Sequence, residues 1–110
     1  MNITQRVEKG VNVFMLEGRI DTQGAYDLEQ VLQAAVAEGK HRMVLDMAEV
    51  SYISSAGLRT LADIVTRNRE QGGDLKLVAL NRKVMRVLRI IGFDKFFMHY
   101  NTLEAAVADF

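Results

Sequence analysis

Two adjacent serines, Ser54 and Ser55, are the residues whose type and setting are best suited to chemistry in this chain of 110 residues. Ala56 and Gly57 follow them and leave space around the hydroxyl groups. They stand where an apolar, strand-like segment gives way to a helix-like one. A serine in such a place could be a catalytic nucleophile, part of a phosphate-binding turn, a phosphorylation site or a helix N-cap.

A serine hydrolase would need groups that the sequence hardly supplies. The nucleophile elbow has the pattern Gly-x-Ser-x-Gly. Around Ser55 the second glycine is present as Gly57, but Ile53 stands in place of the first. The available bases are His41, expected in a loop, and His99, expected on a late strand, and we interpret both as surface or packing residues. We therefore predict no catalytic residues and no enzyme activity.

Nucleotide and metal sites are also not indicated. The P-loop and dinucleotide-binding glycine patterns are absent. The pair Gly72–Gly73 is not followed by the lysine of a P-loop and precedes a strand, so we interpret it as a turn. The carboxylates of Asp21, Asp46 and Glu49 do not have the spacing of metal ligands, and the chain contains no cysteine. We expect no cofactor and no metal.

A phosphorylated serine remains a chemically reasonable alternative to a plain cap. A helix N-terminus offers free N–H groups and the positive end of the helix dipole, so it accommodates a phosphate group without disturbing the fold. Ser54 and Ser55 both qualify, and one of them is expected to cap the helix in any case.

The elements that position these serines follow from apolar periodicity and turn residues. Asp21 or Thr22 is expected to cap the first helix, and Asn81 is expected to cap the third. The third helix is expected to have Val84, Leu88 and Ile91 on its inward face. The pair Asn101 and Glu104 resembles a capping box for the last helix. Strands are predicted for Ile3–Val7, Val11–Ile20, Arg42–Met47, Leu75–Leu80 and Phe96–Tyr100.

The predicted order is strand, strand, helix, and then three strand-helix pairs. It indicates an α/β fold with a four- to five-stranded mixed sheet and about four helices packed mainly on one face. Function in such sheets concentrates at the carboxyl ends of strands. The loops Gly18–Thr22 and Ser51–Ala56 qualify, and we expect them to lie side by side.

Composition narrows the class of protein further. Equal numbers of acidic and basic residues give zero net charge, which argues against direct nucleic-acid binding. We expect one domain over residues 1–110, no signal peptide, no membrane insertion and a cytoplasmic location. The basic series Arg82, Lys83, Arg86 and Arg89 could be a partner-binding patch, although a solvated helix face is the simpler interpretation.

The segment from Asp46 to Arg59, which ends in Val-Ser-Tyr-Ile-Ser-Ser-Ala-Gly-Leu-Arg, resembles the signature of STAS domains. Gly18-Arg19-Ile20-Asp21 resembles a second family loop, and the weaker similarities lie in Gly72–Leu75, Val84–Leu88 and Gly92–Phe97. The family contains sulfate transporter domains and anti-sigma factor antagonists, and the length is similar to that of a stand-alone bacterial antagonist.

The resemblance implies a partner-switching regulator. The unphosphorylated antagonist binds an anti-sigma factor that is also a GHKL-type serine kinase, and this frees the sigma factor. The kinase then phosphorylates one serine, and a PP2C-type phosphatase restores the binding form. The acceptor position corresponds to Ser55. Many members have Asp immediately before it, where this chain has Ser54, so Ser54 is a rival acceptor.

The resemblance also implies a contact surface and a free protein that is a monomer. We expect Asp21→Ala to weaken kinase binding with little change in melting temperature.

The resemblance leaves an alternative function open. Other relatives serve secretion, biofilm formation, stress complexes or lipid-transport ATPases, and if this chain is of that class, it would be an interaction or scaffold subunit whose serines only cap the helix. The partner-binding residues expected for the first class are Asp21, Thr22, Ser54, Ser55, Ala56, Gly57 and Leu58.

Overall fold

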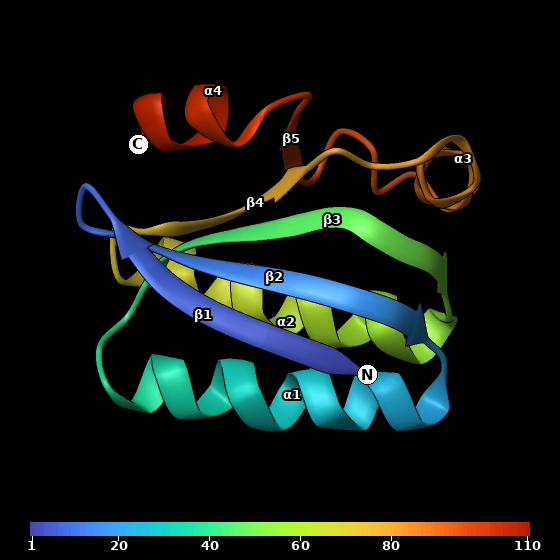
Figure 1. The fold of residues 1–110 in the computed structure, drawn as a ribbon, viewed down its shortest axis with the longest axis horizontal. Coiled ribbons are helices and arrows are strands. Elements are labelled where there is room, and N and C mark those ends of the chain that lie inside the picture. Colours follow the sequence, from blue (N-terminus) through green and yellow to red (C-terminus); the bar gives the residue numbers. More distant parts are fainter.

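The computed structural model describes all 110 residues as a five-stranded sheet with four helices (Figure 1). The strands are β1 (Asn2–Glu8), β2 (Val11–Ile20), β3 (Arg42–Ile53), β4 (Asp74–Val78) and β5 (Met98–Tyr100). The helices are α1 (Thr22–Ala37), α2 (Ser55–Glu70), α3 (Arg82–Ile90) and α4 (Leu103–Ala108). No helix is long and apolar enough to cross a membrane.

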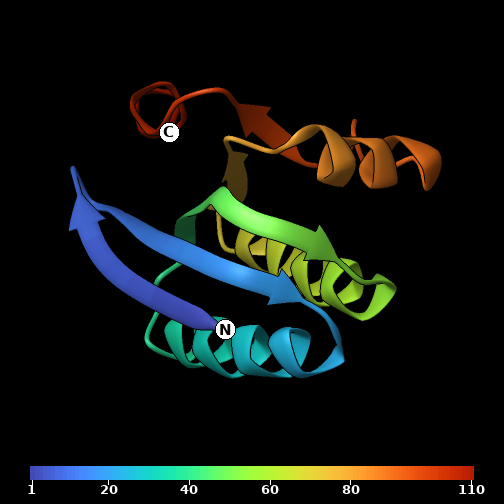
Figure 2. The same ribbon diagram turned by 45° about the vertical axis from the view of Figure 1, so that its right-hand side comes forward.

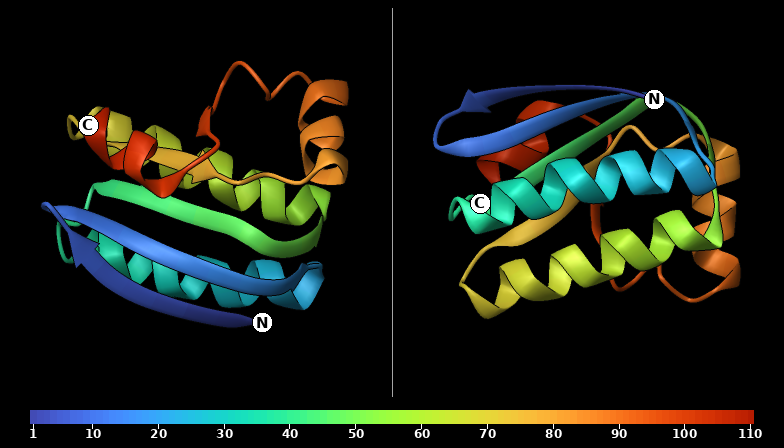
Figure 3. Two further views of the ribbon diagram at one scale, coloured as in Figure 1. Left: turned by 45° about the horizontal axis from the view of Figure 1, so that its top comes forward. Right: turned by 90° about the horizontal axis from the view of Figure 1, so that it is seen from below.

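The strands lie in the sheet in their order along the chain. β1 is antiparallel to β2, and the other neighbouring pairs are parallel, so the sheet is mixed as predicted. The long helices α1 and α2 lie side by side on one face (Figure 3, right), and the short α4 covers the other face (Figure 2). The two long helices therefore share one face, whereas α4 lies on the other face and α3 lies at the end of the sheet (Figure 1).

Successive side chains of a strand point to opposite faces of the sheet, and the apolar ones form a hydrophobic core on each face. In β3, Met43 and Leu45 face the α1–α2 side, whereas Val44 faces the α4 side, and all three are fully buried. Leu28 of α1 and Leu61 of α2 join the larger core. The interpretation of residues 42–47 as a strand covered on both faces is confirmed.

The structure corrects one strand that matters for the site. β3 continues to Ile53 instead of ending at Met47, so Ser51, Tyr52 and Ile53 are strand residues and not part of a loop. The extension pairs with the second half of β2 after a shift in register, with Gly18 opposite Val50. This pairing carries the chain directly to the start of α2.

Three local predictions in the C-terminal third are also wrong. Val84 and Leu88 of α3 are buried as predicted, but Ile91 is 46% exposed. α4 is capped by Thr102, whose hydroxyl accepts a hydrogen bond from the N–H of Ala105, and not by Asn101. β5 begins only at Met98, because the preceding phenylalanines form a turn in which their rings contact one another.

A buried lysine fastens α4 to the sheet. Lys76 of β4 is 4% exposed, its Nζ donates to the backbone oxygen of Asp109 at 2.6 Å, and Nζ lies 3.9 Å from the centre of the Phe110 ring. The Tyr100 hydroxyl donates to the Asp109 carboxylate. Burial lowers the pKa of Lys76, while burial and the Asp109 hydrogen bond raise the pKa of Tyr100 to about 12.

We expect Tyr100→Phe to change how stability depends on alkaline pH. Because the folded pKa of Tyr100 is raised from 10.0 to about 12, its contribution is complete below pH 10 and is lost as the pH rises through that interval. The lowered pKa of Lys76 acts in the opposite direction but is common to both proteins. The difference in free energy of unfolding between wild type and variant should therefore shrink from about pH 10 to about pH 12 in urea titrations.

Tyr26→Phe is the matched control, because Tyr26 is 60% exposed and makes no side-chain hydrogen bond. Its difference from wild type should stay constant over the same interval. A constant difference for Tyr100→Phe as well would show that the Tyr100 hydroxyl does not stabilise the neutral form in the folded protein.

Candidate functional site

The two loops expected to meet do lie side by side. The N–H of Ser54, at the end of β3, donates to the carbonyl oxygen of Ile20, at the end of β2, at 2.7 Å. α1 and α2 begin immediately after these residues, so both helix N-termini stand at the same end of the sheet (Figure 3). The candidate site is this end of the molecule.

The two helices start in the same way. An Asp21 carboxylate oxygen accepts a hydrogen bond from the N–H of Gly24 at 2.8 Å, and the Ser54 hydroxyl accepts one from the N–H of Gly57 at 3.1 Å. Both side chains are N-caps, which satisfy backbone donors that the helix leaves free. Asp21 therefore contributes to stability, and the expectation that Asp21→Ala spares the melting temperature conflicts with its role as a cap.

Both capped turns need glycine at their third position. A Cβ atom on Gly24 would lie 2.3 Å from the carbonyl oxygen of Arg19, and one on Gly57 would lie 2.5 Å from Cγ2 of Ile20. Contacts this short do not occur for real Cβ atoms. The missing side chains allow each helix to start directly against the strand ends.

The structure assigns different positions to the two serines. Ser54 is the half-buried N-cap, whereas Ser55 is the first residue of α2 and is exposed. The Ser55 hydroxyl has no hydrogen-bond partner within the chain. The first turn of α2 contains no acidic side chain, so the positive end of its dipole is not compensated by a first-turn carboxylate. The capping role left open between the serines belongs to Ser54.

The other expected contact residues divide by exposure. Asp21 and Thr22 are exposed and Ala56 is half-buried, so their surfaces are available to a partner. Gly57 is buried, and Leu58 is only 2% exposed and belongs to the core between the sheet and the helices. In the free protein, Leu58 therefore supports the position of α2, and its contact with a partner stays a prediction.

Two residues that the sequence analysis did not select lie at the same end. The Arg19 guanidinium is 4.4 Å from the centre of the Tyr52 ring, and Tyr52 is 41% exposed. They are opposite each other on β2 and β3. Each stands two positions before an N-cap, Asp21 or Ser54, and this shared spacing was a signal that could have identified the pair.

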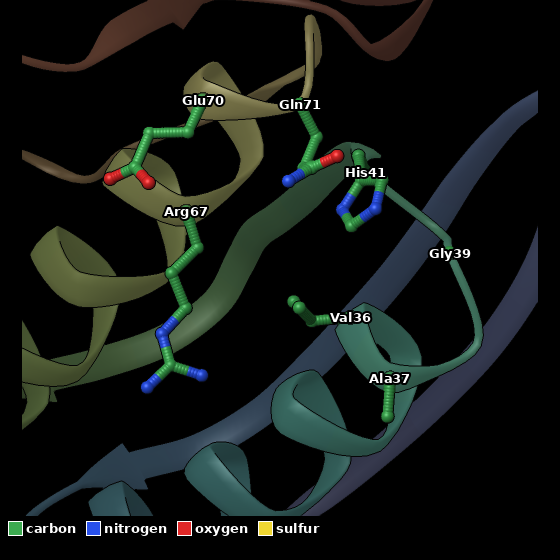
Figure 4. Close-up of a pocket in the computed structure, with 7 residues that line it drawn as sticks. All are labelled: Val36, Ala37, Gly39, His41, Arg67, Glu70 and Gln71. Carbon is green, nitrogen blue, oxygen red and sulfur yellow. The ribbon is translucent and has the colours of Figure 1, made fainter.

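The largest hollow on the surface is at the opposite end of α1 and α2 (Figure 4). It measures about 440 Å³ and is lined by Val36, Ala37, Gly39, His41, Arg67, Glu70 and Gln71. Helix C-termini present the negative end of their dipoles, which disfavours a phosphate group. A His41 ring nitrogen lies 3.3 Å from the Asn68 side-chain oxygen, and His99 is an exposed residue of β5 opposite Leu77 of β4.

Comparison with known proteins identifies the family. Residues 2–106 match the STAS domain, and the chain belongs to the STAS domain family. BtrV of Bordetella bronchiseptica, designated an anti-sigma factor antagonist, is 37% identical over 110 residues, which cover 100% of this chain and 95% of BtrV.

Solved structures agree with this assignment. The crystal structure of an anti-sigma factor antagonist from Mycobacterium paratuberculosis superposes with a TM-score of 0.88 at 30% identity, covering 98% of this chain and 92% of that one. SpoIIAA of Bacillus in its phosphorylated form has the same fold, with a TM-score of 0.75 at 16% identity and 98% coverage of both chains. The STAS fold predicted from the sequence is confirmed.

The division between cap and free hydroxyl predicts unequal effects on stability. Ser54→Ala removes the N-cap and should lower the free energy of unfolding by about 1 kcal/mol. Ser55→Ala removes a hydroxyl without a partner and should change it by less than about 0.5 kcal/mol. Urea denaturation of the two variants measures both values. Equal losses, or a larger loss for Ser55→Ala, would contradict the assignment of the cap.

Proposed function

We propose that this protein is an anti-sigma factor antagonist that is switched by phosphorylation of Ser55. The observation that carries the proposal is the exposed Ser55 hydroxyl at the start of α2, next to a helix turn that Ser54 already caps. The relatives designated as antagonists support the same role. The role is regulatory and involves no catalysis by this chain.

In the unphosphorylated form, the surface around Asp21, Thr22 and Ser55 binds an anti-sigma factor that is also a GHKL-type serine kinase, and this releases the sigma factor. The kinase transfers the γ-phosphoryl group of ATP to the Ser55 oxygen, and the hydroxyl proton and ADP leave. A PP2C-type phosphatase hydrolyses the ester with water and releases inorganic phosphate.

Phosphorylation would change this surface without unfolding the protein. A phosphate group adds nearly two negative charges and three acceptor oxygens at neutral pH. At Ser55 it would lie at the positive end of the α2 dipole, which favours negative charge. Because Ser55 is exposed and outside the core, the added group needs no rearrangement of packed side chains. The partner meets a different charge on an otherwise unchanged scaffold.

We expect Ser55→Ala to bind the kinase and to accept no phosphate, so that it remains permanently active. Ser55→Glu should stay folded but bind poorly, because its charge partly imitates the phosphate. Ser54→Ala is the control: it loses some stability, yet it should still be phosphorylated at Ser55. Phosphate incorporation mapped by mass spectrometry, with binding measured by calorimetry, tests all three variants.

Phosphate on Ser54 alone would move the switch by one residue and contradict the assignment. Phosphate on neither serine, with partner binding intact, would instead favour the scaffold role, in which the serines serve only the helix.

A substitution at Asp21 can distinguish its contact with the kinase from its contribution to stability as an N-cap. Asp21→Asn keeps a side-chain oxygen that can cap α1 but removes the charge, so the free energy of unfolding should change by only a few tenths of a kcal/mol. If the carboxylate contacts the kinase, the same variant should bind about tenfold more weakly. Thermal unfolding and titration calorimetry provide the two measurements. Unchanged affinity would place Asp21 outside the contact surface.

A further inference from the structure

The basic residues of α3 have no acidic partners. Arg82, Lys83, Arg86 and Arg89 are all exposed, and none of them takes part in an ion pair or a side-chain hydrogen bond. By contrast, Arg6, Arg67 and Arg69 each pair with a carboxylate. The whole chain carries no net charge. α3 is therefore a local concentration of uncompensated positive charge.

The position of these charges does not stabilise the free protein. Arg82 and Lys83 stand in the first turn of α3, where the helix dipole disfavours positive charge, and this turn contains no acidic residue. Arg82 and Arg86 are about one turn apart, as are Arg86 and Arg89, and like charges at this spacing repel each other. Ile90 and Ile91 extend the exposed face and are 73% and 46% exposed.

The basic face of α3 begins beside the candidate site. α3 lies at the end of the sheet where α1 and α2 start (Figures 1 and 3). Asn81, which caps α3, donates a side-chain hydrogen bond to the Val50 carbonyl oxygen of β3 at 2.7 Å. Lys83 lines a small hollow of about 40 Å³ together with Ser51 and Tyr52. Through Tyr52 this surface reaches Arg19.

We propose that the basic face of α3, formed by Arg82, Lys83, Arg86 and Arg89, binds an acidic surface of the same protein partner that engages Ser55. This inference rests on the proposed function and adds to it the chemistry of the partner. Uncompensated positive charge next to the switch is complementary to carboxylates on the partner. Tyr52 and Arg19 connect the two areas, and both residue types are enriched at the centres of protein interfaces.

An anionic membrane fits this face less well. A helix that lies on a bilayer inserts an apolar stripe along its length. The apolar stripe of α3 is formed by Val84 and Leu88, which are 1% and 0% exposed and are packed in the core. Only Ile90 and Ile91, at one end of the helix, could insert. An acidic protein surface is therefore the occupant that the geometry favours.

Exposed charges at the rim of an interface act mainly on the rate of association. The test is the double charge reversal Arg86→Glu with Arg89→Glu, since neither side chain holds the fold together. Its association rate with the serine kinase should fall about tenfold at low ionic strength. The difference should become much smaller at high salt, where exposed charges are screened within about 3 Å. Stopped-flow fluorescence measures both rates.

The control is Arg6→Glu with Arg67→Glu, which changes the net charge equally but at residues outside α3. It should associate within about twofold of the wild-type rate if proximity to the site, and not net charge, is what matters. Equal rates for the α3 variant and wild type would overturn the inference and leave the proposed function intact. Equal losses in both variants would also overturn it.

A second measurement does not depend on the kinase. In NMR titrations with a polyglutamate peptide, the amide signals of residues 82–91 should shift for wild type and not for the α3 variant. Shifts distributed over the whole surface, or none at all, would overturn the inference. Binding of the same residues to phosphatidylserine vesicles without binding to polyglutamate would overturn it in favour of a lipid. If no kinase binds wild type, the proposed function fails, while the peptide titration still decides whether α3 recognises carboxylates.

Discussion

The hydrogen bond from the Ser54 N–H to the Ile20 carbonyl holds the ends of β2 and β3 together, and the arrangement of the site depends on it. It places the residue that caps α2 next to the strand that leads into α1. The two glycines at the third positions of the caps then allow both helices to start in contact with these strand ends. A side chain at either glycine would push a helix start away, and the exposed surface at this end would lose its shape.

Under the proposed function, the adjacent serines have two roles that one residue could not fill alone. A capping hydroxyl is occupied, because its lone pair accepts the Gly57 N–H and its side chain is half-buried. An acceptor for a phosphoryl group needs a free oxygen that a second protein can reach. Moving from Ser54 to Ser55 turns the side chain from the cap towards solvent within one residue. Chemistry at Ser55 can therefore leave the start of the helix in place.

Local patterns predicted most of the fold, since alternation in Val11–Ile20 and capping residues such as Asn81 act through near neighbours. The second half of β3 was missed because Ala48, Glu49 and Ser51 interrupt its apolar pattern, and only pairing with β2 keeps it extended. The burial of Leu58 and the exposure of Ile91 depend on how whole helices pack. Among the expected contact residues, the sequence placed Ser55 correctly at the helix start but could not distinguish surface from core within one turn of α2.

The matching helix starts have a consequence for the electrostatic field at this end of the protein. Each of the two parallel dipoles presents a position that favours an anion, and at α1 the Asp21 carboxylate occupies it. At α2 the corresponding cap is a neutral hydroxyl. The two helix starts therefore differ in charge, since a carboxylate caps α1 and a neutral hydroxyl caps α2. Under the proposed phosphorylation of Ser55, a partner would meet a change in the charge difference between the two helix starts and not only a change in the total charge.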